Sequence, residues 1–338
     1  MRKIAAGIAL LALLLAGCVS REQNSGAEQA PDTVPLSELS DLTLQVGDQK
    51  GNTETLLRAA GALDDLPYKI AFSTFTSGPP QVEAATAGKI DFAITGNSPP
   101  IFGAASNAKV KVVSAYDGGG NGDQIVVHAD SPIQSIADLR GKSIAVGKGS
   151  SAHGHILGQL EKAGLSTSDV TLVFLQPADA LSAFTQRQAD AWAIWDPYTA
   201  QTAAQLPVRT IGYARDVTNG YWFGIASDQA LADPKRNTAL LDLLVRYEKA
   251  ARWAKDNPQK WAQSYAAAVG LDVKVAEVVQ GRSLRLPTEL DDEIVASEQK
   301  IADLFAASGQ IASPAPTFDD WVDRRYNDAL RPLFITTN

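Results

Sequence analysis

Short apolar segments alternate with amphipathic segments along most of the chain, and this pattern predicts β-strands that alternate with α-helices. Residues 143–146 form an apolar run that ends at Gly147, as expected for a buried parallel strand. In residues 156–163, apolar side chains recur at helical spacing. The loop between these segments, residues 147–153, is therefore expected to lead into the N-terminus of a helix.

This loop contains Gly149, Ser150, Ser151 and His153, and one of the two serines is expected to be the N-cap. Two interpretations are open. The glycines and serines either turn the chain and cap the helix, or they let a sulfate-like or phosphate-like group approach the free backbone N–H groups.

Two earlier loops have the same position between a predicted strand and a predicted helix. The strands are expected at residues 42–46 and 90–95, and a Ser-Pro pair at the second helix is a common helix start. The polar or small residues at the ends of these strands are Gln49, Gly51 and Asn52 in the first loop, and Thr95, Gly96 and Asn97 in the second.

The chain also contains a weak internal repeat, because residues 83–95 and 181–195 share one order of helix, turn, aspartate and strand. Glycine-rich residues 117–123 predict a crossing between two units, and the aromatic segment 213–226 predicts the return. The expected fold is α/β with two lobes, each a mainly parallel sheet flanked by helices, and a ligand cleft between them.

We assign the lobes from these crossings: residues 41–121 and 224–338 form the first lobe, and residues 122–223 form the second. A monomer of this design can bind a small molecule in its cleft, since ligands lie beyond the carboxyl ends of parallel strands.

The N-terminus predicts export and membrane attachment. Three residues with two basic side chains precede the apolar residues 4–16, and Leu-Ala-Gly then leads to Cys18. This resembles a bacterial lipoprotein signal, so residues 1–18 are expected to be a signal peptide with lipidated Cys18, anchored to the membrane on its extracytoplasmic side. An ordinary signal peptide is the alternative. Polar residues 19–40 predict a flexible tether.

Composition narrows the function. The 338 residues carry a formal net charge of -8, which argues against nucleic acid as a partner. Three histidines and one cysteine leave few groups for metal binding or nucleophilic catalysis, so neither a metal nor another cofactor is expected. The Gly-Ser-Ser-Ala-His sequence has His where an esterase motif needs glycine, and the nucleotide-binding glycine patterns are also incomplete. The lack of complete catalytic and nucleotide-binding patterns favours a binding protein over an enzyme.

Four segments in order, residues 49–53, 95–102, 148–153 and 192–198, resemble the solute-binding lipoproteins of ABC importers for aliphatic sulfonates. The resemblance implies a two-lobed, hinged periplasmic-binding-protein fold, an organosulfonate ligand and delivery to a membrane permease. It also implies a binding role for the following residues: Gln49, Gly51, Asn52, Thr95, Gly96, Asn97, Gly149, Ser150, Ser151 and His153.

Aromatic residues are candidates for holding the organic part of such a ligand, namely Trp195, Tyr221 and Trp222, with core packing as the alternative. The family more often has an acidic residue at the position of Asn97, so a sulfate ester or a larger sulfonated molecule is easier to admit here. Taurine, nitrate and thiamine precursors are alternative ligands of related proteins, and an esterase or synthase on the same fold is the competing class.

Overall fold

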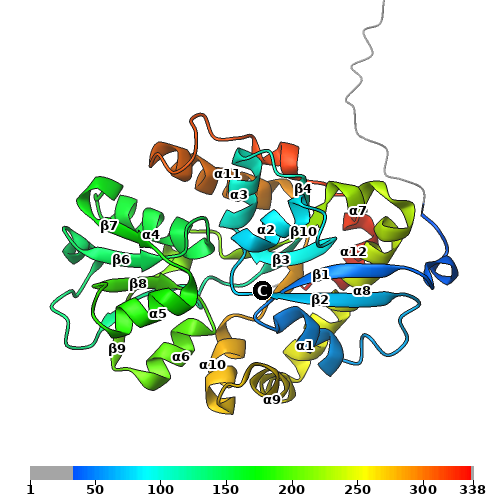
Figure 1. Ribbon diagram of the computed structural model, residues 1–338, viewed down its shortest axis with the longest axis horizontal. Helices are drawn as coiled ribbons and strands as arrows, with labels where there is room; N and C mark the ends of the chain where they lie inside the picture. The colour runs from blue at the N-terminus through cyan, green and yellow to red at the C-terminus, as the bar shows by residue number, and fades with distance from the viewer. Residues whose placement is uncertain (1–32, 336–338) are drawn as a thin grey trace, which may run out of the picture.

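The computed structural model describes residues 33–335, which form two β-sheets flanked by helices (Figure 1). This confirms the predicted α/β class. The first sheet has the strand order β11 (Leu286–Thr288), β4 (Val110–Asp117), β10 (Tyr221–Ser227), β3 (Phe92–Gly96), β1 (Thr43–Gln49) and β2 (Lys69–Phe75). The second has the order β7 (Thr171–Phe174), β6 (Ser143–Val146), β8 (Ala191–Ile194), β5 (Gln124–His128) and β9 (Val208–Tyr213).

Most strands of each sheet run in one direction, as predicted. In the first sheet β1 is parallel to β2 and β3, and β10 is antiparallel to both β3 and β4. In the second sheet β6 is parallel to β7 and β8, and β5 is antiparallel to β8 and β9. The reversed strands β5 and β10 are the first strands reached after each crossing between the sheets, and the short strand β11 is also antiparallel to its neighbour β4.

Helices cover both sheets and also meet between them, since α3 and α11 contact α4, and α10 contacts α6. The helices near the first sheet are α1 (Asn52–Ala59), α2 (Pro79–Thr86), α3 (Ser98–Ala105), α7 (Asp228–Ala232), α8 (Pro234–Asp256), α9 (Pro258–Val269), α10 (Val273–Arg282), α11 (Asp292–Ala307) and α12 (Asn327–Leu330). Those near the second are α4 (Ser151–Lys162), α5 (Pro177–Thr185) and α6 (Tyr198–Gln205).

Short 3₁₀ helices complete the chain. Two of them lie where none was expected, namely η4 in the return segment and η1 in the tether. The return segment at residues 213–226 is interrupted by η4 (Ala214–Asp216), so only its second part is the strand β10. Because β10 belongs to the first sheet, the expected lobe boundary at residue 223 falls inside a strand. The chain leaves the second sheet at the end of β9. The other short helices are η1 (Leu36–Leu39), η2 (Ile136–Leu139), η3 (Thr167–Asp169), η5 (Phe318–Trp321) and η6 (Arg331–Leu333).

The end of the expected tether is packed against the fold rather than free. Leu39 in η1 is fully buried, and the backbone N–H of Val34 donates a hydrogen bond to Thr238 Oγ1 at 3.1 Å. The expected signal peptide, with Cys18, and residues 19–32 lie outside the described residues. Within residues 33–335, no helix has both the length and the apolar character required to cross a membrane.

The two crossings between the sheets run side by side. The N–H of Gly118 donates to the carbonyl of Gly220 at 3.2 Å, and the N–H of Arg215 donates to the carbonyl of Gly120 at 3.1 Å. Gly220 has a φ of +68°, and a Cβ there would lie 2.8 Å from the backbone N of Gly120. Glycine is therefore required at this contact for both its conformation and its size.

Glu248 is one of several ionisable side chains that lie buried inside the fold. Glu248 on α8 is 1% exposed, and one of its carboxyl oxygens has no hydrogen-bond partner within the described residues. Burial raises its pKa from the ordinary 4.5 to about 8, because the low-dielectric interior disfavours the charged form. The folded protein therefore holds this carboxyl group in its protonated form at neutral pH.

Replacing Glu248 with Gln is expected to raise the melting temperature, with a gain that grows between about pH 5 and pH 8. The folded pKa lies above the unfolded one, so the proton stabilises the fold at low pH and this contribution is lost as the pH rises towards 8. Gln has no proton to lose. Thermal unfolding followed by circular dichroism measures the difference, and E161Q on the exposed face of α4 is the control. The same pH dependence in both variants would contradict this prediction.

Candidate functional site

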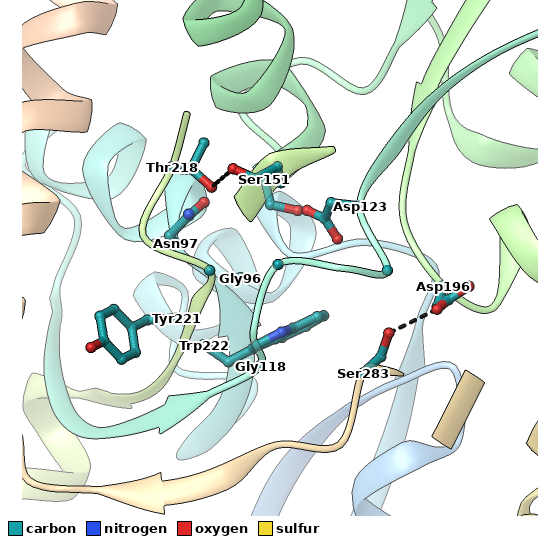
Figure 2. A pocket seen from close by; sticks show the side chains of 14 residues that line it. Gly96, Asn97, Gly118, Asp123, Ser151, Asp196, Thr218, Tyr221, Trp222 and Ser283 are labelled. Atoms are coloured by element: carbon teal, nitrogen blue, oxygen red, sulfur yellow. Dashed lines mark hydrogen bonds between the residues drawn. The ribbon is translucent and has the colours of Figure 1, made fainter. Parts of the chain in front are cut away.

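A small enclosed cavity of about 20 Å³ lies between the two sheets (Figure 2). Both crossings line it, together with the end of β3, the N-terminus of α4, Asp196 two residues after β8, and Ser283 directly after α10. This volume is close to that needed for one water molecule. The cavity therefore lies where the expected cleft should be, but a ligand of several heavy atoms needs its walls to move apart.

Five of the predicted binding residues line this cavity together. They come from three separate parts of the chain. The predicted alternation of strands and helices had already placed the ends of these segments at the cleft between the sheets. These residues are Gly96, Asn97, Ser151, Tyr221 and Trp222. The aromatic pair therefore lies beside the cavity rather than in a distant part of the core.

The side chain of Asn97 is held by a chain of hydrogen bonds behind the cavity. Its Nδ2 donates to Asn219 Oδ1 at 3.0 Å, and its Oδ1 accepts from Ser98 Oγ at 3.0 Å. Asn219 Nδ2 in turn donates to Glu298 Oε2 at 2.7 Å. Glu298 is fully buried, and burial raises its pKa well above the usual range. Because a primary amide has two donor hydrogens, the Asn97 amide still has one for a ligand.

The two serines of the predicted cradle have different roles. Ser150 is the N-cap residue of α4, but its hydroxyl donates to the carbonyl of Gly147 at 2.7 Å and it does not line the cavity. Ser151, one residue later, lines the cavity with its hydroxyl bonded to the Asp123 carboxyl group. The cap and cradle interpretations are thus divided between neighbouring residues.

Gly149 and His153 stabilise the loop on the side that faces away from the cavity. Gly149 has a φ of +71°, and its N–H donates to His153 Nδ1 at 3.2 Å. The His153 ring is fully buried and lies 5.2 Å from Phe305 and 5.1 Å from Phe174, centroid to centroid. Burial lowers its pKa to about 4, so the ring is neutral at pH 7. Neither residue lines the cavity, because the helix turns this face towards α3 and α11.

Gln49 and Thr95 form a second polar group near the cavity. Val46 pairs with Phe92 and Gly47 with Ala93, so the same parallel register extended by two residues places Gln49 beside Thr95. In the described part of the chain, Gln49 Oε1 and Thr95 Oγ1 are buried without a hydrogen-bond partner. Buried polar atoms are normally paired, so these two atoms are candidates for contact with a polar ligand.

Three further predicted residues lie away from the cavity. Gly51 is the N-cap of α1, and Asn52 is the first residue of that helix. Gly51 contributes instead to a surface hollow with Lys50 and Thr55. Trp195 is 2% exposed and packs edge-to-face on Tyr198 at 6.0 Å between ring centroids, which is the core-packing alternative.

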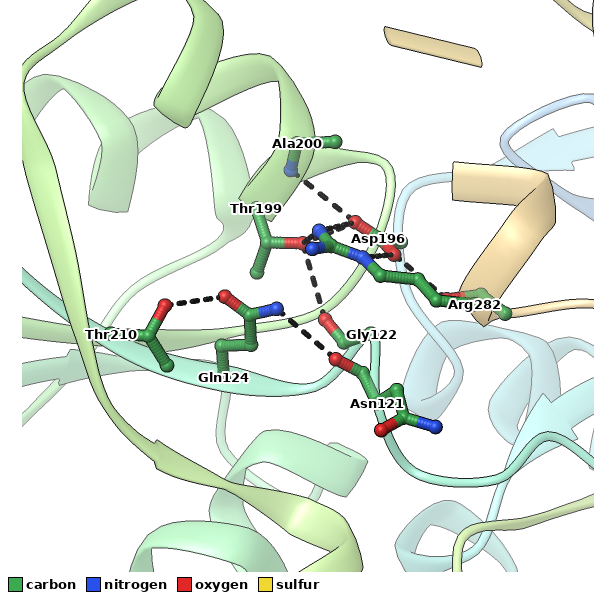
Figure 3. Close-up of polar contacts among 9 residues, drawn as sticks. Asn121, Gly122, Gln124, Asp196, Thr199, Ala200, Thr210 and Arg282 are labelled. Atoms are coloured by element: carbon green, nitrogen blue, oxygen red, sulfur yellow. Dashed lines mark hydrogen bonds and ion pairs between the residues drawn. The ribbon is translucent and has the colours of Figure 1, made fainter. Parts of the chain in front are cut away.

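Asp196 joins the two halves of the molecule (Figure 3). Its carboxylate accepts from Arg282 Nε and Nη2, both at 2.7 Å, and from Ser283 Oγ at 2.7 Å. The Asp196 side chain is 2% exposed, so this pair is well shielded from water. It ties the end of β8 in the second sheet to α10 beside the first.

Asp123 is a second acidic residue in the cavity wall that the sequence did not single out. It lies immediately before β5 in the first crossing, beside Ser151 (Figure 2). Burial raises its pKa to about 7, the hydrogen bond from Ser151 lowers it, and the nearby charge of Asp196 raises it. In the sequence, Asp123 lies among glycines that predict a crossing between two units, so it was not considered as a site residue.

Known proteins show what this architecture belongs to. The family described as the periplasmic substrate-binding protein of phosphonate ABC transporters matches residues 64–267. A protein of Escherichia coli (strain K12) named for binding aliphatic sulfonates is 32% identical over 302 residues, which make up 88% of this chain and 91% of that protein. The chain belongs to the periplasmic substrate-binding proteins of ABC transporters. The resemblance found in the sequence is thereby confirmed.

Solved structures of relatives have the same two-lobed architecture as this substrate-binding protein. The alkanesulfonate-binding protein SsuA of Xanthomonas axonopodis pv. citri, bound to MOPS, is 29% identical with a TM-score of 0.76, covering 83% of this chain and 98% of that one. The desulfurization enzyme DszB is 17% identical with a TM-score of 0.61, covering 86% and 99%, and shows the fold alone. The more similar relatives are named as binding proteins.

Replacing Arg282 with Ala is expected to lower the free energy of unfolding by about 1–3 kcal/mol, because the buried Asp196 carboxylate loses two charge-assisted hydrogen bonds. Urea denaturation measures this change. The matched control is R58A, since Arg58 pairs with Glu54 on an exposed helix face, where ion pairs contribute little. An equal effect of the two replacements would show that the Asp196 pair contributes no more than a surface pair.

Proposed function

We propose that this protein captures an aliphatic sulfonate outside the cytoplasm and delivers it to the permease of an ABC importer. The observation that carries this proposal is the meeting of Asn97 and Ser151, from opposite sides, in one cavity at the N-terminus of α4. The names of the E. coli and Xanthomonas relatives support the choice of ligand class.

A sulfonate fits neutral hydrogen-bond donors. Its three oxygens only accept hydrogen bonds, and it holds no proton at neutral pH. The Asn97 amide, the Ser151 hydroxyl and the N-terminal backbone N–H groups of α4 are donors, each worth about 1.5–3 kcal/mol when the acceptor is charged. The helix dipole adds about 0.3–2 kcal/mol. Tyr221 and Trp222 then lie beside the cavity for the organic part of the ligand.

Ligand entry requires the two sheets to separate as lobes. We take the first lobe as the six-stranded sheet with its helices and the second as residues 122–213, with the boundary moved to the end of β9. The paired crossings at residues 118–123 and 214–220 are the proposed hinge, since hinges are short segments that absorb backbone rotation. The permease then recognises the closed form of the protein with its ligand.

The attachment proposal concerns residues outside 33–335. We propose that residues 1–18 are a lipoprotein signal and that lipidated Cys18 anchors a monomer to the membrane. The sequence of the signal, with basic, apolar and small residues in order before the cysteine, supports this proposal. Mass spectrometry of the mature N-terminus, with C18S as the control, decides whether a lipid is attached.

Replacing Ser151 with Ala is expected to weaken sulfonate binding by about 10- to 100-fold, which corresponds to one charge-assisted hydrogen bond. Isothermal titration calorimetry with short alkanesulfonates measures this loss. The matched control is S150A, because the Ser150 hydroxyl bonds within the loop and is not part of the cavity wall. If S150A weakened binding as much as S151A, the cavity would not be the ligand site.

A ligand screen tests the proposed function itself. Alkanesulfonates are expected to give saturable heats, whereas alkylphosphonates of equal length, which approach a double negative charge near neutral pH, are expected to bind more weakly beside Asp123 and Asp196. Sulfate and nitrate complete the screen. Absence of binding by every sulfonate would overturn the proposed ligand class.

A further inference from the structure

Arg285 is a buried positive charge that has no negative partner among the described residues. It lies two positions after Ser283, which belongs to the cavity wall, and it is 8% exposed. Within residues 33–335 its guanidinium forms no ion pair, and Nη1 is enclosed without a hydrogen-bond partner. Arginine stays protonated in proteins, and buried charges are normally paired. This charge therefore needs a partner that the described part of the chain does not supply.

Stacking on Trp222 holds this charge beside the cavity. The guanidinium carbon of Arg285 lies 3.7 Å from the centroid of the Trp222 ring, which is close enough for a cation–π contact. Trp222 itself lines the cavity, where its ring lies close to Gly118 (Figure 2). The charge of Arg285 also opposes the rise in the pKa of Asp123, another residue of the wall. Two observations thus place the charge of Arg285 at the cavity.

Other carboxylates of this region already have partners. Asp48 accepts a hydrogen bond from the backbone N–H of Thr53 at 2.9 Å, at the N-terminus of α1, where the helix dipole favours a negative charge. Asp196 pairs with Arg282 at 2.7 Å and is neutralised by it. The negative charges of Asp48 and Asp196 are therefore balanced without Arg285.

Asp123 is the remaining acidic group of the cavity wall, and its charge depends on what lies beside it. Burial raises its pKa to about 7, while the hydrogen bond from Ser151 and the charge of Arg285 oppose this rise. A sulfonate bound at Ser151 places a second negative charge next to Asp123, which favours the protonated, neutral form of the carboxyl group. With Asp123 neutral, the positive charge of Arg285 matches the single negative charge of the sulfonate.

We propose that Arg285 is a specificity-determining residue, because it supplies the counter-charge for the sulfonate that Asn97 and Ser151 hold. The ligand completes an ion pair that the described residues leave open, and Trp222 keeps the guanidinium in place for it. This assignment rests on the proposed function and adds a charged residue to a site that otherwise consists of neutral donors. It also explains how a cavity with two carboxyl groups in its wall accepts an anion.

The assignment implies a conflict between stability and binding. A buried charge without a partner costs free energy in the folded protein, and this cost is offset only when an anion binds. Removing the charge is therefore expected to stabilise the protein without ligand and to weaken the ligand complex. A purely structural arginine predicts instead that both properties are lost together. The sign of the change in melting temperature distinguishes the two roles.

The R285M variant is the main test. Met has an unbranched side chain that packs on Trp222 but carries no charge. Without ligand, its melting temperature is expected to equal or exceed that of the unaltered protein. Its affinity for propanesulfonate, measured by isothermal titration calorimetry, is expected to fall on the order of 10- to 100-fold. The control R252M removes an exposed charge from α8, where Arg252 bonds to the carbonyl of Leu333, and is expected to bind as the unaltered protein does.

The R285K variant keeps the charge without the planar guanidinium. Because Lys stacks less well than Arg, a loss of affinity below about tenfold is expected, smaller than that of R285M. Propanesulfonate binding by R285M that equals that of the unaltered protein contradicts the proposal. A loss of both melting temperature and affinity in R285M that R285K does not reverse also contradicts it, because it indicates a structural role.

A crystal structure of the unaltered protein with propanesulfonate gives a test that needs no variant. The sulfonate is expected to be the negatively charged group nearest to the Arg285 guanidinium. A carboxylate in that place would overturn the assignment and leave the proposed function intact. If the unaltered protein binds no sulfonate, the proposed function fails together with the role of Arg285. Failure of the charge assignment alone is thus distinguished from failure of sulfonate binding.

Discussion

The close contact between the two crossings is the constraint on which the site depends. Gly118, Gly120 and Gly220 let the backbones approach closely enough to exchange hydrogen bonds, and side chains at these positions would not fit. The contact brings Asp123 and Tyr221, which are far apart in sequence, to the same cavity. The end of β3 and the N-terminus of α4 complete the wall of this cavity. Rotation at the crossings therefore changes the cavity from all sides at once.

Much of the fold could be predicted because its signals are local. Apolar runs, glycine stops and Ser-Pro helix starts specify each strand–loop–helix unit within a few residues, and parallel sheets then bring the loop ends together. For this reason Gly96, Asn97 and Ser151, which were predicted together, line one cavity in the structure. The expected lobe boundary at residue 223 lies within β10, since one run of aromatic and apolar residues contains the end of β9, a 3₁₀ helix and β10. Alternation alone does not reveal such an interruption.

The remaining site residues depend on partners distant in sequence. His153 is on the same helix end as Ser151, and the packing of α3, α11 and β7 decides that its ring lies among aromatic residues. The sequence did not indicate the pairing of Asp196 with Arg282, because two residues 86 positions apart form no local pattern. The glycines near Asp123 indicated a crossing and not a binding site, and its proximity to Ser151 is a tertiary contact. Sequence patterns identified polar loop ends, whereas tertiary contacts determined which side chains face the cavity.

The aromatic contact behind the cradle loop has an energetic consequence for ligand capture. Phe102 and Phe305, beside the first sheet, meet His153 and Phe174, which belong to the second. In the proposed hinge motion, separating the lobes would expose the contacting faces of these rings to water, and closing the lobes would bury them again. Burial of apolar surface lowers the heat capacity, so closure has a negative heat-capacity change in addition to that of the ligand contacts. With the proposed hinge motion, ligand capture would therefore depend on temperature through rings that lie outside the cavity wall.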